Sequence, residues 1–328
     1  MLSDTDRGIY GVFFTAFFLG SVIVTELVMV PSQVVAVDLP QERRLGVARR
    51  SLLLGLLPGV AGMAAALAAA FLTADLTTTT VLTALTLTAA VTIVVSPRQD
   101  HVRQLLHIAD RSWHAVAVSS VQLAGVAGAV VVLLLADVEK AWIPFGSLAV
   151  ANILSLATGL VLAGAHHPPQ HASSFDFRSL AHSGKWLVIR AATPAAFAFV
   201  AANILTQLAG PVAYGYAEAA RQVAQPITVL AVGLMAVLGP RAVRAGTSGD
   251  AAAGSHNRRS FIGLMLLGSI AYAGLVGFDW ALNPMAWLVP AAYAVAGLVV
   301  ATVVANFLAA VFLVYGRELL GAGHARSL

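Results

Sequence analysis

Residues 212–240 read VAYGYAEAARQVAQPITVLAVGLMAVLGP, an apolar run of the length that a membrane-spanning helix needs. At about 100° per residue, one face of this helix gathers its polar side chains. We call them the polar stripe, which consists of Tyr214, Glu218, Arg221, Gln222 and Gln225. An ionisable group inside a span is costly and usually faces a bundle interior or a wet cavity. The stretch therefore predicts a membrane helix with one functional face.

The composition extends this prediction to the whole chain. Of its 328 residues, 59% are hydrophobic and only 10% are charged, and the mean hydropathy is +0.85. Soluble domains carry about 25% charged residues. We therefore expect an all-α, multi-pass membrane protein. Cysteine is absent, which excludes disulfides, thiolate nucleophiles and cysteine-based metal sites.

Nine segments are long and apolar enough to cross a bilayer. They are residues 8–30, 51–73, 79–95, 113–138, 142–165, 186–209, 212–240, 261–278 and 285–315. The last is long enough to be tilted or broken, and Pro290 offers a place for the break. The threonines at 77–80 suit a turn that caps the third helix.

Basic residues gather in alternate loops. One set of loops and the tail hold Arg43, Arg44, Arg49, Arg50, Arg98, Arg103, Arg111, Arg178, Lys185, Arg241, Arg244, Arg258, Arg259, Arg317 and Arg326. The opposite side holds Arg7 and Lys140. Cytoplasmic loops carry the excess of Lys and Arg, so the N-terminus is expected outside and the C-terminus in the cytoplasm. The expected location is the plasma (inner) membrane of a prokaryote.

One long polar break divides the chain. We expect a first helical lobe at 1–165, a cytoplasmic linker at 166–184 and a second lobe at 185–328, with five and four helices respectively. Within the linker, residues 175–180 suggest a short interfacial helix. The linker histidines His166, His167 and His171 show no metal-ligand spacing, and no metal or cofactor is expected.

The polar stripe has two interpretations. In the first, Arg221 holds an anionic head group, because a guanidinium matches phosphate oxygens with forked donors, and Gln222 and Gln225 contact sugar hydroxyls. In the second, Glu218 and Arg221 neutralise each other at i, i+3. Both stay open from the sequence.

Other polar residues lie in the expected spans. On the sixth helix, Arg190 can contact substrate or extend to the interface, while Asn203 and Gln207 suit either a cavity or an interhelical hydrogen bond. Glu26 is the ion-coupling candidate, with an interfacial pairing to nearby arginines as the favoured alternative.

A family resemblance rests on the middle of the chain, clearest over residues 175–245. The motifs are Arg178-Ser179-Leu180, Gly184-Lys185-Trp186, Pro194, Asn203, Gln207-Leu208-Ala209-Gly210, Tyr214-Gly215-Tyr216, Ala219-Ala220-Arg221-Gln222, Pro226 and Pro240-Arg241. They resemble the second half of Wzx-type oligosaccharide flippases, a branch of the multidrug/oligosaccharidyl-lipid/polysaccharide exporter superfamily. The resemblance implies two six-helix lobes around a central cavity. Relative to that plan, the chain is expected to be shortened at both ends, lacking the first helix and the last two.

The same resemblance implies a function without catalytic residues. We expect a transporter, not an enzyme, that carries an anionic lipid-linked oligosaccharide or polysaccharide precursor from the cytoplasmic to the outer leaflet by alternating access. Membrane lipids and polysaccharide-assembly proteins are the expected partners, and nucleic acid is not. Two alternatives stay open: a cation-coupled drug exporter of the same superfamily, and a non-transporting membrane subunit or remnant.

Overall fold

The computed structural model describes residues 3–37, 39–164, 176–281 and 283–322. Within these ranges the secondary structure is helical, and nine helical segments are long and apolar enough to cross a membrane. The expected all-α, multi-pass membrane fold is therefore confirmed. Of the expected linker, residues 166–175 lie outside the described ranges, and the three linker histidines lie there too.

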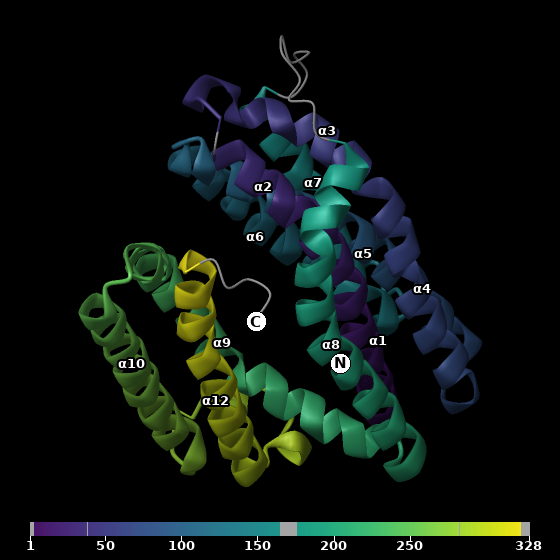
Figure 1. Ribbon diagram of the computed structural model, residues 1–328. Helices are drawn as coiled ribbons and strands as arrows, with labels where there is room; N and C mark the ends of the chain where they lie inside the picture. The colour runs from purple at the N-terminus through teal and green to yellow at the C-terminus, as the bar shows by residue number, and fades with distance from the viewer. Residues whose placement is uncertain (1–2, 38, 165–175, 282, 323–328) are drawn as a thin grey trace. The chain divides into compact units, whose positions relative to one another are not determined.

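Long helices alternate with short helical connections (Figure 1). In chain order they are α1 (Asp4–Val24), the π-helical turn η1 (Thr25–Met29), α2 (Val30–Val37), η2 (Gln41–Gly46), α3 (Val47–Leu54), α4 (Leu56–Thr73), η3 (Ala74–Leu76), α5 (Thr79–Ile108), α6 (Ser112–Leu135), η4 (Lys140–Trp142), α7 (Ile143–Ala163), α8 (Phe177–Ala209), α9 (Pro211–Ser248), α10 (Ala251–Gly277), α11 (Met285–Leu288), η5 (Ala291–Tyr293) and α12 (Ala296–Gly321).

The chain forms two compact units, Met1–Tyr214 and Gly215–Leu328. In the first unit α8 packs along α1 and against η1, and Figure 1 shows α8 beside α1. The boundary thus falls in the first turn of α9, whereas the sequence suggested a second lobe beginning at residue 185. The five-plus-four lobe plan stays a prediction.

Local capping chemistry sets several helix starts. The Thr78 hydroxyl accepts a hydrogen bond from the backbone N–H of Val81 at 3.4 Å, which matches the expected cap of α5. The Asp176 carboxylate caps α8 by accepting from the backbone N–H of Ser179 at 2.7 Å. Gly210, at φ +87°, separates α8 from α9, a backbone conformation that favours glycine.

Two expected boundaries are wrong because helices continue into stretches that look like loops. The helix expected to end at Val95 runs through Pro97 to Ile108, and the one expected to start at Phe261 starts at Ala251. Arg98, Arg103, Arg258 and Arg259 therefore lie on helices and not in loops. Interior hydrogen bonds and ion pairs stabilise these polar turns, as described below.

The expected interfacial helix is also wrong as a separate element. From Phe177 onward its residues form the first turns of α8, which runs unbroken to Ala209. The break expected at Pro290 is confirmed: α11 ends at Leu288, Val289 is extended, and α12 begins at Ala296. Proline cannot donate a backbone hydrogen bond, and it biases the preceding residue away from the helical region.

The first helix widens into the π-turn η1 just before Pro31, where the sequence suggested that it would end. Residue 31 has no N–H for the carbonyl of Leu27, and its ring would crowd that carbonyl in a regular helix. The wider turn relieves this conflict, so the helix continues as α2. Gly184 of α8 lies against this turn, where an added Cβ would be 2.6 Å from the Leu27 carbonyl oxygen and 2.7 Å from that of Glu26.

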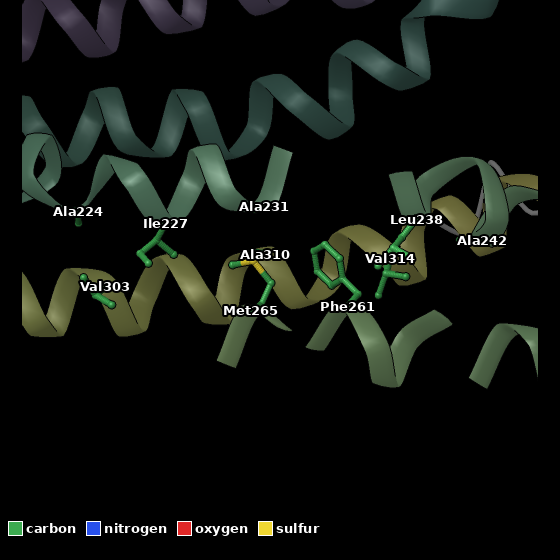
Figure 2. Close-up of a cluster of buried hydrophobic side chains, with 10 residues drawn as sticks. All are labelled: Ala224, Ile227, Ala231, Leu238, Ala242, Phe261, Met265, Val303, Ala310 and Val314. Carbon is green, nitrogen blue, oxygen red and sulfur yellow. The ribbon is translucent and has the colours of Figure 1, made fainter. Parts of the chain in front are cut away.

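The second unit has a core of apolar side chains shared by three helices. In Figure 2, Ile227 of α9 points toward α12, and Phe261 and Met265 of α10 reach the same layer. Val303 and Val314 of α12 complete it. Phe261, Met265 and Val314 are fully buried. This packing fixes the part of α9 that follows the polar stripe.

Candidate functional site

The centre of the polar stripe is an ion pair on α9. Arg221 donates from Nε to Glu218 Oε2 at 2.8 Å and from Nη2 to Oε1 at 2.6 Å. Gln222 Nε2 donates to the same Oε1 at 3.1 Å. The Glu218 side chain has no exposed surface, whereas 31% of the Arg221 side chain is exposed. The accessible side of the pair is therefore cationic.

The ends of the stripe differ in burial. Tyr214 is buried, and Gln225 is exposed one turn beyond Arg221. Between them the Glu218 carboxylate organises both Arg221 and Gln222. The mutual neutralisation expected from the i, i+3 spacing thus forms, and contact with a ligand stays a prediction.

Polar side chains from neighbouring helices hold α9 in the region of the stripe. The Tyr272 hydroxyl of α10 donates to the Val223 carbonyl at 2.5 Å. The Asn306 amide of α12 donates to the Ala224 carbonyl at 3.4 Å. These bonds fix the helix one turn after Arg221, so the ion pair belongs to a defined surface of the second unit.

The candidates on α8 do not form one cluster. Asn203 is buried and donates to the carbonyl of Phe199 in its own helix at 2.7 Å, while its Oδ1 atom has no hydrogen-bond partner among the described residues. Gln207 donates to the Leu72 carbonyl of α4, which is the interhelical bond expected from the sequence. Arg190 is exposed. The ligand roles of these three residues stay predictions.

Glu26 lies in the π-turn η1 and is partly buried. Single π-turns occur often at functional sites, which makes the position notable. The turn is covered by the close approach of Gly184. Ion coupling at Glu26 stays a prediction, as does its pairing with arginines.

Sequence reasoning missed a buried polar layer in the first unit. His101 of α5 lies between Gln33 of α2, at 3.2 Å from its Nδ1, and Ser51 of α3, at 2.7 Å from its Nε2. On the same helix Gln99 donates to the Ser155 hydroxyl of α7 at 3.0 Å. The polar run after Pro97 is the available signal, but its local pattern favours a loop.

The described residues contain no group of three His, Asp or Glu side chains placed to hold a metal ion. The chemistry that the described polar surfaces offer is hydrogen bonding and charge recognition.

Comparison with known proteins gives one informative match. The sequence matches no protein-family model and no curated protein. The fold is similar to a solved structure described as the inward-facing conformation of a multidrug resistance MATE family transporter of the MOP superfamily. The TM-score is 0.66 at 13% sequence identity, over 99% of this chain and 82% of that chain. At this identity the likeness shows the fold, which is the one found in the superfamily suggested by the sequence motifs, without singling out the oligosaccharide branch.

Proposed function

We propose that this protein is a membrane transporter that moves an anionic lipid-linked oligosaccharide or polysaccharide precursor from the cytoplasmic to the outer leaflet by alternating access. The fold likeness to a transporter over 99% of the chain supports transport. One observation carries the choice of an anion: in the ion pair on α9 the Glu218 side chain is fully buried, and the partly exposed side chain is that of Arg221.

The proposed cycle needs recognition and movement but no covalent chemistry. A phosphate of the head group approaches Arg221, whose planar guanidinium suits phosphate oxygens, while Gln222 and Gln225 contact sugar hydroxyls. The lipid tail stays in the bilayer, and rocking of helical bundles moves the site from one face to the other. An inside-negative potential favours outward movement of an anion by about 2.3 kcal/mol per charge per 100 mV.

A drug exporter coupled to a cation is the second candidate, because the similar solved structure is described as a multidrug transporter. Such coupling needs an acid that can exchange a proton or metal ion. Glu218 is fully buried, and its carboxylate already accepts hydrogen bonds from Arg221 and Gln222. This arrangement favours the anion carrier.

Three variants test the proposal in a cell that depends on this protein for surface polysaccharide. Arg221→Gln combined with Glu218→Gln removes both charges without leaving a buried carboxylate unpaired. We expect this double variant to lower polymer export about 10- to 100-fold at normal protein level. This factor corresponds to the loss of one charge-assisted hydrogen bond to the substrate. Arg221→Lys should retain partial export, because it keeps the charge but loses the forked geometry.

Glu218→Gln alone is the matched control, since it keeps the cation. Its export should stay near that of the unaltered protein. Export by the double variant at the unaltered level would refute the anion role. Loss of cationic-dye efflux in Glu218→Gln, with polymer export unchanged in all variants, would identify the drug exporter instead. If cells with the protein show no more polymer export and no more dye efflux than cells that lack it, the result would support a non-transporting subunit.

A further inference from the structure

A second cation site lies in the first unit, on helices that do not carry the polar stripe. Arg98 of α5 is only 5% exposed. Its Nη1 donates to the carbonyl of Val94 in the same helix, while Nε and Nη2 have no hydrogen-bond partner among the described residues. An ionised guanidinium buried in this way is unfavourable, so an external anion is the expected partner.

The surroundings of Arg98 form a groove of about 630 Å³. Arg49 of α3 provides a second cation at the groove. The described residues lining it include no carboxylate, and the remaining ones are apolar, among them Leu56 of α4 and Leu156 and Leu160 of α7. The groove thus combines two positive charges with an aliphatic wall.

The position of Arg98 along α5 matches the level of lipid phosphates. It lies about 28 Å along the helix from Thr79, at about 1.5 Å per residue. The hydrocarbon core of a bilayer is about 30 Å thick, so with Thr79 at one interface Arg98 lies near the other. In the expected topology that interface is cytoplasmic, where anionic lipids give a negative surface potential.

The wall of the groove has exposed aliphatic side chains that an acyl chain of a lipid could contact. Leu53, Leu56 and Val161 are exposed and line the groove. Gly59 leaves room for the guanidinium at its inner side, since a Cβ there would lie 3.1 Å from both Nη1 and Nη2. A phosphate at Arg98 would therefore have its lipid tail beside aliphatic side chains on membrane-spanning helices.

We propose that the groove formed by α3, α4, α5 and α7 binds an anionic glycerophospholipid of the bilayer, with the phosphate at Arg98, the outer part of the head group at Arg49 and an acyl chain along Leu156 and Leu160. The lipid satisfies the buried cation and fills the groove. This site is separate from Arg221 and does not depend on the proposed transport function.

The test measures lipid binding to the purified full-length protein by native mass spectrometry, with phosphatidylglycerol as the probe and phosphatidylcholine as the neutral lipid. The unaltered protein should bind phosphatidylglycerol about tenfold more tightly than phosphatidylcholine, a difference of about 1.4 kcal/mol. Arg98→Gln should abolish this preference. Arg49→Gln should reduce it, because the head group loses its outer cation.

Two further variants keep the test valid even if Arg98→Gln does not fold. Leu156→Trp fills the groove, leaves Arg98 in place and should weaken phosphatidylglycerol binding about tenfold. Arg43→Gln is the matched control, because it removes an exposed charge from the same expected side outside the groove, and it should bind like the unaltered protein. Equal binding of the two lipids by the unaltered protein would overturn the proposal. So would a preserved preference in Arg98→Gln together with unchanged phosphatidylglycerol binding in Leu156→Trp. Inorganic phosphate that competes with phosphatidylglycerol at equal concentration would overturn the lipid as the occupant.

Discussion

At the scale of single residues, the protein contains two arginines with opposite environments. Arg221 shares its charge with the buried carboxylate of Glu218 and keeps 31% of its side chain exposed. Arg98 is buried without a carboxylate bonded to it among the described residues, and it bonds to a carbonyl of its own helix. The first arrangement presents a cation while keeping the interior neutral. The second leaves a charge that is satisfied only when something else binds.

The ion pair on α9 leads to a prediction about stability. Arg221→Gln leaves the Glu218 carboxylate buried without its cation, and we expect it to destabilise the purified protein by about 3 kcal/mol. The double variant Glu218→Gln/Arg221→Gln removes the buried charge and should recover most of this loss. Thermal unfolding in detergent is compared across the two single variants and the double variant. The comparison gives the interaction free energy between Glu218 and Arg221. A double variant no more stable than Arg221→Gln would show that the carboxylate is not held by the arginine.

The sequence alone identified the stripe because it depends on local spacing. Glu218, Arg221 and Gln222 lie within four positions on one helix, so a helical period places them together. For Arg98 the local pattern predicts a loop, because the contacts that keep this stretch helical are not local. The polar partners that stabilise its helix, such as Ser155 beside Gln99 and Ser51 beside His101, lie on other helices far along the chain. The local hydropathy pattern carries no information about those distant contacts.

At the scale of helices, α8 and η1 cross in close contact, and the contact has a clear physical origin. Pro31 prevents a regular helical bond to the Leu27 carbonyl, and the turn widens into a π-helix. That carbonyl lies against Gly184, a position where even a methyl group would meet backbone atoms. The sequence suggested a helix end at this proline, because the packing that keeps the helix running comes from a segment about 150 residues later.

This crossing gives a prediction for Gly184→Ala. The added Cβ would meet the backbone oxygens of Glu26 and Leu27, and we expect a loss of about 1–3 kcal/mol in stability. Gly128→Ala on α6 is the matched control, because nothing lies within 4 Å of its added Cβ. The control should be neutral or more stable by up to about 1 kcal/mol. Thermal unfolding of both variants checks the prediction, and equal stability of the two would contradict the close approach.

At the scale of the whole molecule, the pattern of basic loops predicts the orientation of the chain in the membrane. The absence of cysteine allows single-cysteine labelling without removing native residues. Ala74→Cys and Ala136→Cys should react with a membrane-impermeant maleimide on intact cells, because their connections are expected outside. Ser112→Cys and Ser248→Cys should react only after the cells are permeabilised. Labelling of Ser248→Cys on intact cells would reverse the orientation and with it the proposed direction of transport.

The overall architecture was largely predictable, because the apolar segments and the break at Pro290 follow from composition and local chemistry. Their detailed bounds required tertiary contacts. Arg258 shows this on α10, where an ion pair of 2.5 Å with Glu318 of α12 stabilises turns that the sequence assigned to a loop. The fold likeness to a solved transporter then places this architecture in a known fold while leaving the cargo as a proposal.

The central claim is that the protein moves an anionic lipid-linked glycan, and leaflet movement in vesicles tests it most directly. The purified protein is reconstituted with a fluorescent lipid-diphosphate oligosaccharide, and a membrane-impermeant quencher reports how much of the lipid reaches the outer leaflet. We expect the unaltered protein and Glu218→Gln to expose all of the probe with time. Vesicles containing Glu218→Gln/Arg221→Gln should expose the probe about 10- to 100-fold more slowly, close to the rate in protein-free vesicles. Movement of the probe at equal rates in the unaltered protein and the double variant, or no movement with either, would contradict the account.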